Sequence, residues 1–196
     1  MNLKIYKYKQ NYLDISKTDE IIKLNSEKNI ILDIGSGEGE FLTELAIKNK
    51  NELHIGIEIK YGRIIKSLKR VDKIGLKNIK FIYGDINPIV ESIFYSNNIK
   101  NIYINNPDPW PKDRHIKNRI IKSNLLNKLF QILIRNGEMI IKTDSSEYLE
   151  YMKKEINESK FKKWKSYKKN SLPLTKFQKD FKNTNKEIYA LYLTKN

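Results

Sequence analysis

The sequence contains no cysteine and only two histidines, His54 and His115. Without cysteine the chain can form no disulfide, present no thiolate nucleophile and build no cysteine-based zinc site. Two histidines are too few for the three-histidine zinc site of many metalloenzymes. We therefore expect chemistry that needs neither a thiol nor a metal.

Long apolar runs are also missing. A membrane-spanning helix needs about 20 consecutive apolar residues, and no stretch of this chain approaches that length. Residues 1–20 are basic and rich in tyrosine, without the apolar segment of a signal peptide. We expect a cytoplasmic protein that does not enter a membrane.

What the sequence has in excess is positive charge. Its 196 residues include 38 lysines and arginines against 23 acidic residues, which gives a formal net charge of +15. Such an excess favours a polyanionic partner, either nucleic acid, which is the first candidate, or an anionic membrane surface. A general compositional bias is the alternative, because lysine, asparagine and isoleucine are frequent throughout the chain.

From residue 30 onward, short β-branched runs alternate with amphipathic stretches. The pattern predicts strands at 30–34, 53–57, 79–83, 102–104, 138–142 and 188–194. It predicts helices at 38–48, 61–74, 88–94, 119–134 and 145–157. Repeated strand–helix–strand units indicate an α/β fold with a mostly parallel, doubly wound sheet and an antiparallel C-terminal edge. Residues 1–27 are predicted to form a basic arm, and 28–196 a single domain.

A glycine-rich turn, DIGSGEG, begins at Asp33, where the first predicted strand meets a helix. Glycines such as Gly35 and Gly37 allow a ligand to approach the backbone closely. The dinucleotide fingerprint requires a third glycine where Glu40 stands, and the Gly-Lys-Ser/Thr of a P-loop is missing. Asp33 and Glu38 would repel a pyrophosphate. The turn therefore suits a cofactor without phosphates and with a positive amino group, such as S-adenosylmethionine; a simple helix-capping turn is the alternative.

Two further acids stand at predicted strand ends. Glu58 lies 19 residues after Gly39, where an acid can accept hydrogen bonds from ribose hydroxyls. Asp85 follows the third strand and could accept from an adenine amino group, while Ile86 packs against the ring. Either acid could instead begin a helix or occupy a turn.

The stretch NNPDPWPKDRH, residues 105–115, is the most distinctive part of the chain. It follows an apolar strand, and its three prolines fix φ angles and remove donors, so the loop is rigid without pairing in the sheet. Ligands bind just outside the carboxyl ends of strands in open α/β sheets, so this loop is predicted to be a wall of the active site. Its Trp110 could plug the loop or stack on a base.

A basic cluster surrounds the end of this loop. Its members are Lys112, Arg114, Lys117 and Arg119. Their density beside the predicted site favours contacts with phosphate groups, and solvated surface charge is the alternative. His115 is predicted to be a structural hydrogen-bonding partner or a phosphate contact rather than a general base.

Together these motifs resemble the bacterial tRNA (guanine-N7)-methyltransferases. The glycine turn and strand-end acids are moderately specific, whereas the block 108–115 followed by Lys117 and Arg119 is highly specific. The similarity extends from about residue 28 to the C-terminus and includes KTD at 142–144 and TKF at 175–177. The resemblance implies a Rossmann-like class I fold. It also implies methyl transfer from S-adenosylmethionine to N7 of a guanosine in the variable loop of tRNA, at position 46.

The resemblance also implies roles for individual residues. The acids that match those holding S-adenosylmethionine are Asp33, Glu58, Asp85 and Asp108. Asp108 also matches the residue assigned as catalytic. The positions that match substrate contacts are Lys112, Asp144, Thr175, Lys176, Phe177 and Gln178. The family usually has glutamate where this chain has Gln178, which can form hydrogen bonds but carries no charge. Asp144 could also begin a capping box with Glu147.

Guanine N7 has a free lone pair, so attack on a sulfonium methyl group needs no proton removal from that nitrogen. Catalysis can therefore rest on aligning the nucleophile, the methyl group and the leaving sulfur. The product base is cationic, and Asp108 is the first candidate to stabilise that charge. Asp108 could also orient the guanine by accepting from N1–H or the exocyclic amine.

Two other functions stay open. Residues 106–110 partly match the Asn/Asp-Pro-Pro-aromatic loop of enzymes that methylate exocyclic amines, although the prolines here flank an aspartate. The second is a non-catalytic RNA-binding module, against which the intact cofactor acids and glycines argue. The broken glycine fingerprint argues against an NAD-dependent oxidoreductase. We expect a monomer or a homodimer with tRNA as its partner.

Overall fold

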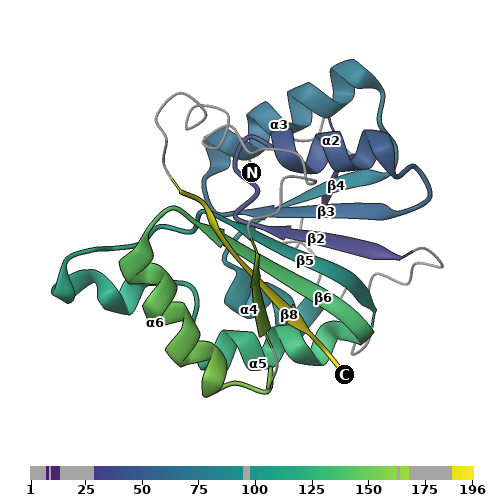
Figure 1. Cartoon of the computed structure of the whole chain (residues 1–196). Helices are drawn as coiled ribbons and strands as arrows, with labels where there is room; N and C mark the ends of the chain where they lie inside the picture. Colours follow the sequence, from purple (N-terminus) through teal and green to yellow (C-terminus); the bar gives the residue numbers. More distant parts are fainter. Residues whose placement is uncertain (1–7, 9, 14–28, 95–97, 163, 168–186) are drawn as a thin grey trace.

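The computed structural model describes residues 8, 10–13, 29–94, 98–162, 164–167 and 187–196. Within these residues, eight strands form one sheet in the order β1-β4-β3-β2-β5-β6-β8-β7 (Figure 1). The strands are β1 (Tyr12–Leu13), β2 (Ile30–Ile34), β3 (Leu53–Glu58), β4 (Ile79–Tyr83), β5 (Ile99–Asn105), β6 (Leu133–Thr143), β7 (Trp164–Tyr167) and β8 (Tyr189–Thr194). Strands β1 to β6 pair in parallel, and β8 pairs antiparallel with both β6 and β7. The predicted mostly parallel sheet with an antiparallel edge is confirmed.

The order of the strands reverses beside β2. The chain runs outward from β2 through β3 to β4, and then returns to place β5 on the other side of β2. In doubly wound sheets such a reversal opens a crevice outside the carboxyl ends of the strands. Asp33 near the end of β2 pairs in register with Gly56 on one side and with Tyr103 on the other. The strand-end residues of β2, β3 and β5 therefore lie at one edge of the sheet.

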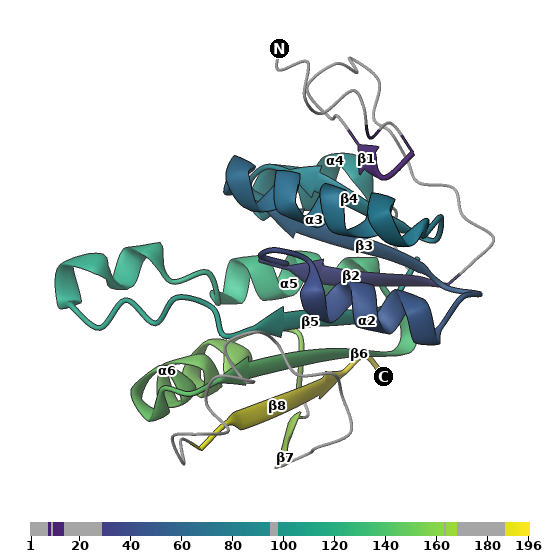
Figure 2. The same ribbon diagram turned by 90° about the horizontal axis from the view of Figure 1, so that it is seen from above.

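Helices cover both faces of the sheet (Figure 2). The helices α2 (Glu40–Lys48) and α3 (Tyr61–Ile74) lie on one face, and α4 (Ile86–Ile93), α5 (Ser123–Ile132) and α6 (Ser146–Asn157) lie on the other. All five residues of β2 are buried because each face of this central strand packs against a helical layer. Leu32 belongs to the cluster on the α4–α6 side and Ile31 to a cluster with Phe41 of α2. Continuous burial explains why β2 is apolar throughout except for Asp33.

The predicted helix at 119–134 is wrong at both ends. The chain instead forms a short 3-10 helix, η2 (Asp113–Asn118), an extended connection and then α5. Ile121 is buried outside any helix, and its N–H donates to the Tyr148 hydroxyl of α6 at 3.3 Å. Ile134 belongs to β6, which begins at Leu133. The apolar residues at both ends of this range pack against other elements, although their spacing in the sequence is typical of a helix.

Part of the predicted N-terminal arm lies against the sheet. Residues of β1 pair in parallel with β4, and the Phe81 N–H donates to the Asn11 carbonyl oxygen at 2.7 Å. The buried Asn11 side chain donates to the carbonyl oxygens of Leu76 at 2.9 Å and Ile79 at 2.8 Å. The remainder of the predicted arm, except Tyr8 and Gln10, lies outside the described residues. In the portion described, no helix has the length and apolarity to cross a bilayer.

Candidate active site

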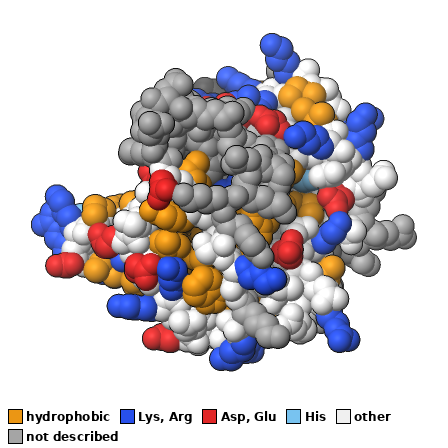
Figure 3. All heavy atoms as spheres, in the orientation of Figure 1, with side chains coloured by type: hydrophobic (Ala, Val, Ile, Leu, Met, Phe, Trp, Pro, Cys, Tyr) orange, Lys and Arg blue, Asp and Glu red, His pale blue; other side chains and the backbone are white. Residues whose placement is uncertain are grey.

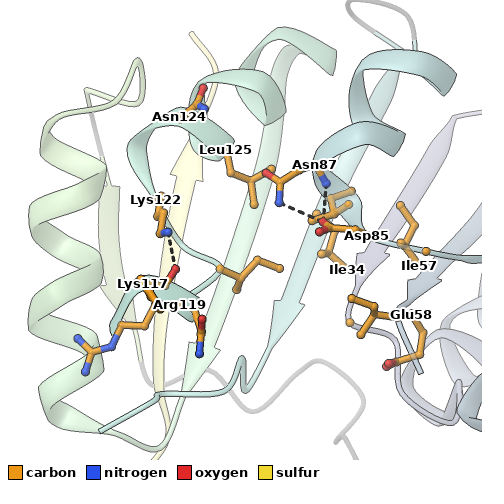
Figure 4. A pocket seen from close by; sticks show the side chains of 16 residues that line it. Ile34, Ile57, Glu58, Asp85, Asn87, Lys117, Arg119, Lys122, Asn124 and Leu125 are labelled. Atoms are coloured by element: carbon orange, nitrogen blue, oxygen red, sulfur yellow. Dashed lines mark hydrogen bonds between the residues drawn. The ribbon is translucent and has the colours of Figure 1, made fainter. Parts of the chain in front are cut away.

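A cavity of about 500 Å³ lies outside the carboxyl ends of β2, β3 and β4 (Figure 4). Gly35, Glu58 and Asp85, each from a different strand end, line one side of it. The opposite side is formed by residues between 117 and 125, from the end of η2 to the first turn of α5, and includes Lys117, Arg119 and Lys122. The fold thus brings together three of the residues predicted to bind a cofactor, at the place where the strand order reverses.

The glycine-rich turn has a backbone that only glycine adopts easily. Gly35 has a φ of 74° and Gly37 a φ of 60°, and a Cβ atom at either position would meet no heavy atom within 4 Å. Glycine is therefore required by the positive φ angles and not by a lack of space for a side chain. The N–H groups of Gly35 and Ser36 donate to the Ile57 carbonyl oxygen at 2.8 and 3.0 Å, which ties the turn to β3. The open space above the turn leaves room for a ligand beside the backbone.

Glu58 is fixed in place by the backbone around it. Its side chain is 4% exposed, and its two carboxylate oxygens accept separate hydrogen bonds. Oε2 accepts from the Gly37 N–H at 3.0 Å, and Oε1 accepts from the Lys60 N–H at 2.8 Å. Arg63 Nη1 lies 3.7 Å from Oε2. The two carboxylate oxygens have further lone pairs, which suit hydroxyl donors such as those of a ribose.

Asp85 combines a structural contact with a position in the cavity wall. It is the N-cap of α4, and its Oδ1 accepts from the Asn87 N–H at 2.9 Å and from Asn87 Nδ2 at 3.0 Å. Figure 4 shows these two contacts. Within the described residues Oδ2 has no hydrogen bond, so capping leaves one oxygen for a ligand. The buried Ile86 beside it adds an apolar part to the cavity wall.

Asp33 lies behind the glycine turn and does not line the cavity. It is 2% exposed, and burial raises its pKa from 3.8 to about 7, against a smaller lowering by the Asn105 side chain, whose Nδ2 is 3.5 Å away. Burial lowers the pKa of Lys142, which the nearby charge of Asp33 raises in part. Asn105 and Lys142 have no predicted role from the sequence, although a polar residue that ends an apolar strand indicates a functional position.

Two buried atoms near this acid lack partners. Ser36 Oγ and Asn105 Oδ1 have no hydrogen bond within the described residues. Unsatisfied buried polar atoms are costly, and functional sites are where they are tolerated. A ligand with an amino group and further polar atoms would satisfy them and would also stabilise the ionised form of Asp33. The donor set therefore fits the amino-acid end of S-adenosylmethionine.

Asp108 and Lys112 stand apart from the cavity. Both are exposed on the loop after β5, and neither lines the pocket. The η2 segment extends the loop away from the sheet (Figure 2), with the Trp110 ring in edge contact with His115 at 5.6 Å. Lys112, Arg114 and Lys117 are exposed. Figure 3 shows positive side chains at the end of this projection, with an acidic side chain near them. The loop presents an acid and several cations to solvent beside the cavity.

Arg119 is not a surface cation. Its side chain is 3% exposed and forms an ion pair with Glu147 Oε1 at 2.6 Å. Its Nε also donates to the Pro109 carbonyl oxygen at 2.7 Å. The prediction that Arg119 shares in a phosphate-binding cluster was therefore wrong, because its donors are used inside the protein.

Asp144 is half-buried at the end of β6, and the predicted capping box that begins with it was wrong. Ser145 is the N-cap of α6, and its hydroxyl accepts from the Tyr148 N–H at 3.2 Å. Glu147 pairs with Arg119 instead. Asp144 has no hydrogen bond or ion pair within the described residues and is thus not needed to cap the helix. The other predicted substrate contacts, Thr175, Lys176, Phe177 and Gln178, lie outside the described residues.

The acids of this region are not arranged for a metal. Among the residues whose structure is described, no group of three histidine or acidic side chains could hold a metal ion. Glu58 already accepts backbone hydrogen bonds on both oxygens, and Asp33 is buried behind the turn. The geometry instead suits an organic ligand that carries hydroxyl and amino groups.

Comparison with known proteins extends this picture. Residues 27–191 match a family model described as "Putative methyltransferase". The tRNA (guanine-N(7)-)-methyltransferase of Prochlorococcus marinus (strain MIT 9215) is 37% identical over 171 residues, which cover 85% of this chain and 81% of that protein. The protein of the same name from Aquifex aeolicus (strain VF5) is 35% identical over 186 residues, 94% of this chain and 61% of that protein.

A solved structure shares the fold. The S-adenosylmethionine-dependent O-methyltransferase of Thermotoga maritima superposes with a TM-score of 0.61 at 17% identity, over 87% of this chain and 60% of that one. Against several curated relatives, the match spans only about three fifths of the relative's own length (63%, 61% and 60%). The family model and the long matches at 35–37% identity nevertheless agree. This chain belongs to the tRNA (guanine-N(7)-)-methyltransferase family.

Proposed function

We propose that this protein transfers a methyl group from S-adenosylmethionine to N7 of a guanosine in tRNA. The observation that carries the proposal is the cavity at the strand reversal, whose wall combines the glycine turn with Glu58 and Asp85. It is flanked by a loop that holds Asp108 and exposed cations. The names of the two relatives that match 85% and 94% of the chain support tRNA as the substrate.

The residues present fit the cofactor in three places. Glu58 would hold the ribose hydroxyls, because two backbone hydrogen bonds set its orientation and it lines the cavity. Asp85 would accept from the adenine amino group, with Ile86 against the ring. Asp33 would face the amino group from behind the glycine turn. When bound, the cofactor supplies a methyl group on a positively charged sulfur.

The acceptor nitrogen needs orientation more than activation. Guanine N7 carries a lone pair, so no residue has to remove a proton before the attack. An exposed Asp108 suits a base that arrives from solvent, because the carboxylate can accept from its N1–H or amine and can stabilise the positive charge that develops on the ring. Asp144, at the end of the strand next to β5, is a second acid for orienting the same base.

The charge of the loop supports a tRNA substrate. Lys112, Arg114 and Lys117 are exposed on one segment, where they can contact several backbone phosphates. We assign the target to the variable-loop guanosine at position 46, as the family resemblance implies. Thr175 to Gln178 complete the proposed substrate contacts. We assign the protein to the cytoplasm as the compartment in which it would meet tRNA.

Methyl transfer to an unmodified tRNA transcript, followed by chemical cleavage at N7-methylguanosine, tests the proposal. We expect one cleavage site in the variable loop, and none when that guanosine is replaced by adenosine. Methyl incorporation without cleavage would indicate methylation of an exocyclic amine instead. Binding of tRNA without any binding of S-adenosylmethionine in calorimetry would indicate a non-catalytic RNA-binding module.

A further inference from the structure

We propose that Arg119 is a positioning residue that holds the Asp108 loop against α6. The inference rests on the proposed function, because it assigns Asp108 to the reaction. It concerns a side chain that does not meet solvent and that links two parts of the site far apart in sequence. Arg119 acts through the backbone of the loop and not through contact with a tRNA phosphate.

The guanidinium connects the loop and the helix directly. Nε donates to the Pro109 carbonyl oxygen at 2.7 Å, and Nη2 lies 3.4 Å from the Trp110 carbonyl oxygen. The same Nη2 donates to Glu147 Oε1 of α6 at 2.6 Å. Three oxygens from two elements are therefore held by one planar group. A lysine ammonium could not reproduce this fork.

Aromatic rings enclose the same group. The guanidinium carbon lies 4.7 Å from the ring centroid of Tyr151 and 5.2 Å from that of Tyr148, both on α6. Tyr148 is fully buried, and its hydroxyl accepts from the Ile121 N–H, two residues after Arg119. The Arg119 guanidinium is thus fixed against α6, and the carbonyl groups of the loop are hydrogen-bonded to it.

The loop has a conformation that needs such support. Trp110 has a φ of 43°, in the left-handed region that bulky residues rarely adopt, and a proline follows it. A residue before proline normally has an extended backbone. The two carbonyl groups that Arg119 contacts are those of Pro109 and Trp110, on both sides of the strained Trp110 backbone. Strain of this kind persists only where the surroundings enforce it.

Asp108 is the residue directly before this held pair. Helix α6 begins directly after the Asp144–Ser145 segment at the end of β6. By joining Pro109 and Trp110 to α6, Arg119 sets Asp108 relative to Asp144. Arg119 also lies in the cavity wall opposite the strand-end acids. Loss of Arg119 should leave Glu58 and Asp85 in place on the other wall and allow Asp108 to move. Displacements of about 1 Å at a positioned group can reduce the rate on the order of 100-fold.

The variant Arg119→Lys in the full chain tests the inference, with Arg135→Gln as a control. Arg135 is exposed at the opposite edge of the sheet, so its variant also loses an arginine but touches neither the loop nor α6. We expect R119K to lower kcat for tRNA at least about tenfold. The Kd for S-adenosylmethionine, measured by calorimetry, should stay within about threefold of the wild type. R135Q should retain wild-type kcat.

A second readout reports on the loop itself. Limited trypsin digestion should cut after Lys112, Arg114 and Lys117 faster in R119K than in wild type or R135Q, because the segment is no longer held. Glu147→Ala removes one of the three contacts through an exposed partner and should show the same changes to a smaller degree. If R119K does not fold, the kcat and the digestion pattern of E147A test the inference in its place.

Two results would overturn the inference. One is a kcat within twofold of wild type in folded R119K and in E147A. The other is a loss of cofactor affinity as large as the loss of turnover, which would place Arg119 in the cofactor site. If wild-type protein itself leaves tRNA unmethylated, the proposed function fails instead. The digestion pattern would still decide whether Arg119 holds the loop.

Discussion

The Glu58 carboxylate accepts the backbone N–H of Gly37 at 3.0 Å, so the end of β3 and the glycine turn after β2 are held as one unit. The same carboxylate accepts the Lys60 N–H at 2.8 Å at the start of α3. One buried acid therefore satisfies two backbone donors and still faces the cavity. Its structural and ligand-binding roles depend on the same negative charge.

Replacing Glu58 by glutamine should weaken both roles. The amide has one accepting oxygen, so one backbone N–H loses its acceptor, which costs about 1–3 kcal/mol. For a domain of this size that corresponds to a fall in Tm of roughly 2–12 °C. Affinity for S-adenosylmethionine should fall about tenfold. Calorimetry and thermal unfolding measure the two effects, and Glu150→Gln on the exposed face of α6 is the control. Unchanged affinity in E58Q would remove Glu58 from the ribose site.

Asp108→Asn should separate chemistry from cofactor binding. Asp108 is exposed and does not line the cavity, so the Kd for S-adenosylmethionine should change less than about threefold. Loss of its charge beside the developing cation should lower kcat by about 100-fold. Single-turnover methylation of tRNA measures this rate. Asp113→Asn, on the same projecting segment, should keep most of the activity. A D108N enzyme that binds cofactor and turns over normally would rule out a central role for this acid.

Asp33 should make stability depend on pH. Burial raises its pKa in the folded protein to about 7, whereas the unfolded chain titrates near 3.8. Between these values the folded state binds more protons, so the free energy of unfolding should fall as pH rises from about 4 to 7 and then level off. Asp33→Asn should flatten this slope, whereas Asp72→Asn on the exposed side of α3 should keep it. Urea unfolding at several pH values measures the effect, and a stability that rises across this window would contradict it.

Binding of tRNA should depend on salt through the projecting segment. Removing two phosphate contacts with Lys112→Gln and Arg114→Gln should reduce the slope of log K against log salt concentration by about 1.5–2. The pair Lys48→Gln and Lys50→Gln removes the same charge near the end of α2, at the other edge of the sheet, and should leave the slope unchanged. Filter binding across a salt series measures both. An equal reduction of the slope in the two double variants would show that only the net charge of the protein affects tRNA binding.

Asn11 should stabilise the edge of the sheet. Its side chain donates to two carbonyl oxygens, at 2.9 and 2.8 Å, and is buried beside β4. Asn11→Ala leaves both without this donor, so we expect a loss of about 1–3 kcal/mol. Gln10→Ala, whose side chain is exposed, should cost much less. Chemical denaturation measures the free energy of unfolding of both variants. A neutral N11A would show that this part of the N-terminal region contributes nothing to the fold.

The sequence predicted several elements to the residue. The ranges 30–34, 61–74 and 79–83 coincide with β2, α3 and β4, because a glycine follows each of these apolar patterns and ends it. The prediction from the sequence failed where residues are buried by packing against elements distant in the chain. Residues 119–134 have apolar side chains at helical spacing, yet the first of them pack against α6 and the last belong to β6. A local pattern does not show which distant element will cover it.

The sequence by itself determined the chemistry available to this protein. An acidic glycine turn, acids at three strand ends and an Asp-Pro-Trp loop excluded a phosphate-bearing cofactor and indicated a methyltransferase. Tertiary structure decided how those groups act. It buries Asp33 and so raises the pKa of this acid. It also places Arg119 in the interior, although phosphate contacts were expected for that residue. Both outcomes depend on burial and on contacts between residues far apart in the chain, which no local spacing encodes.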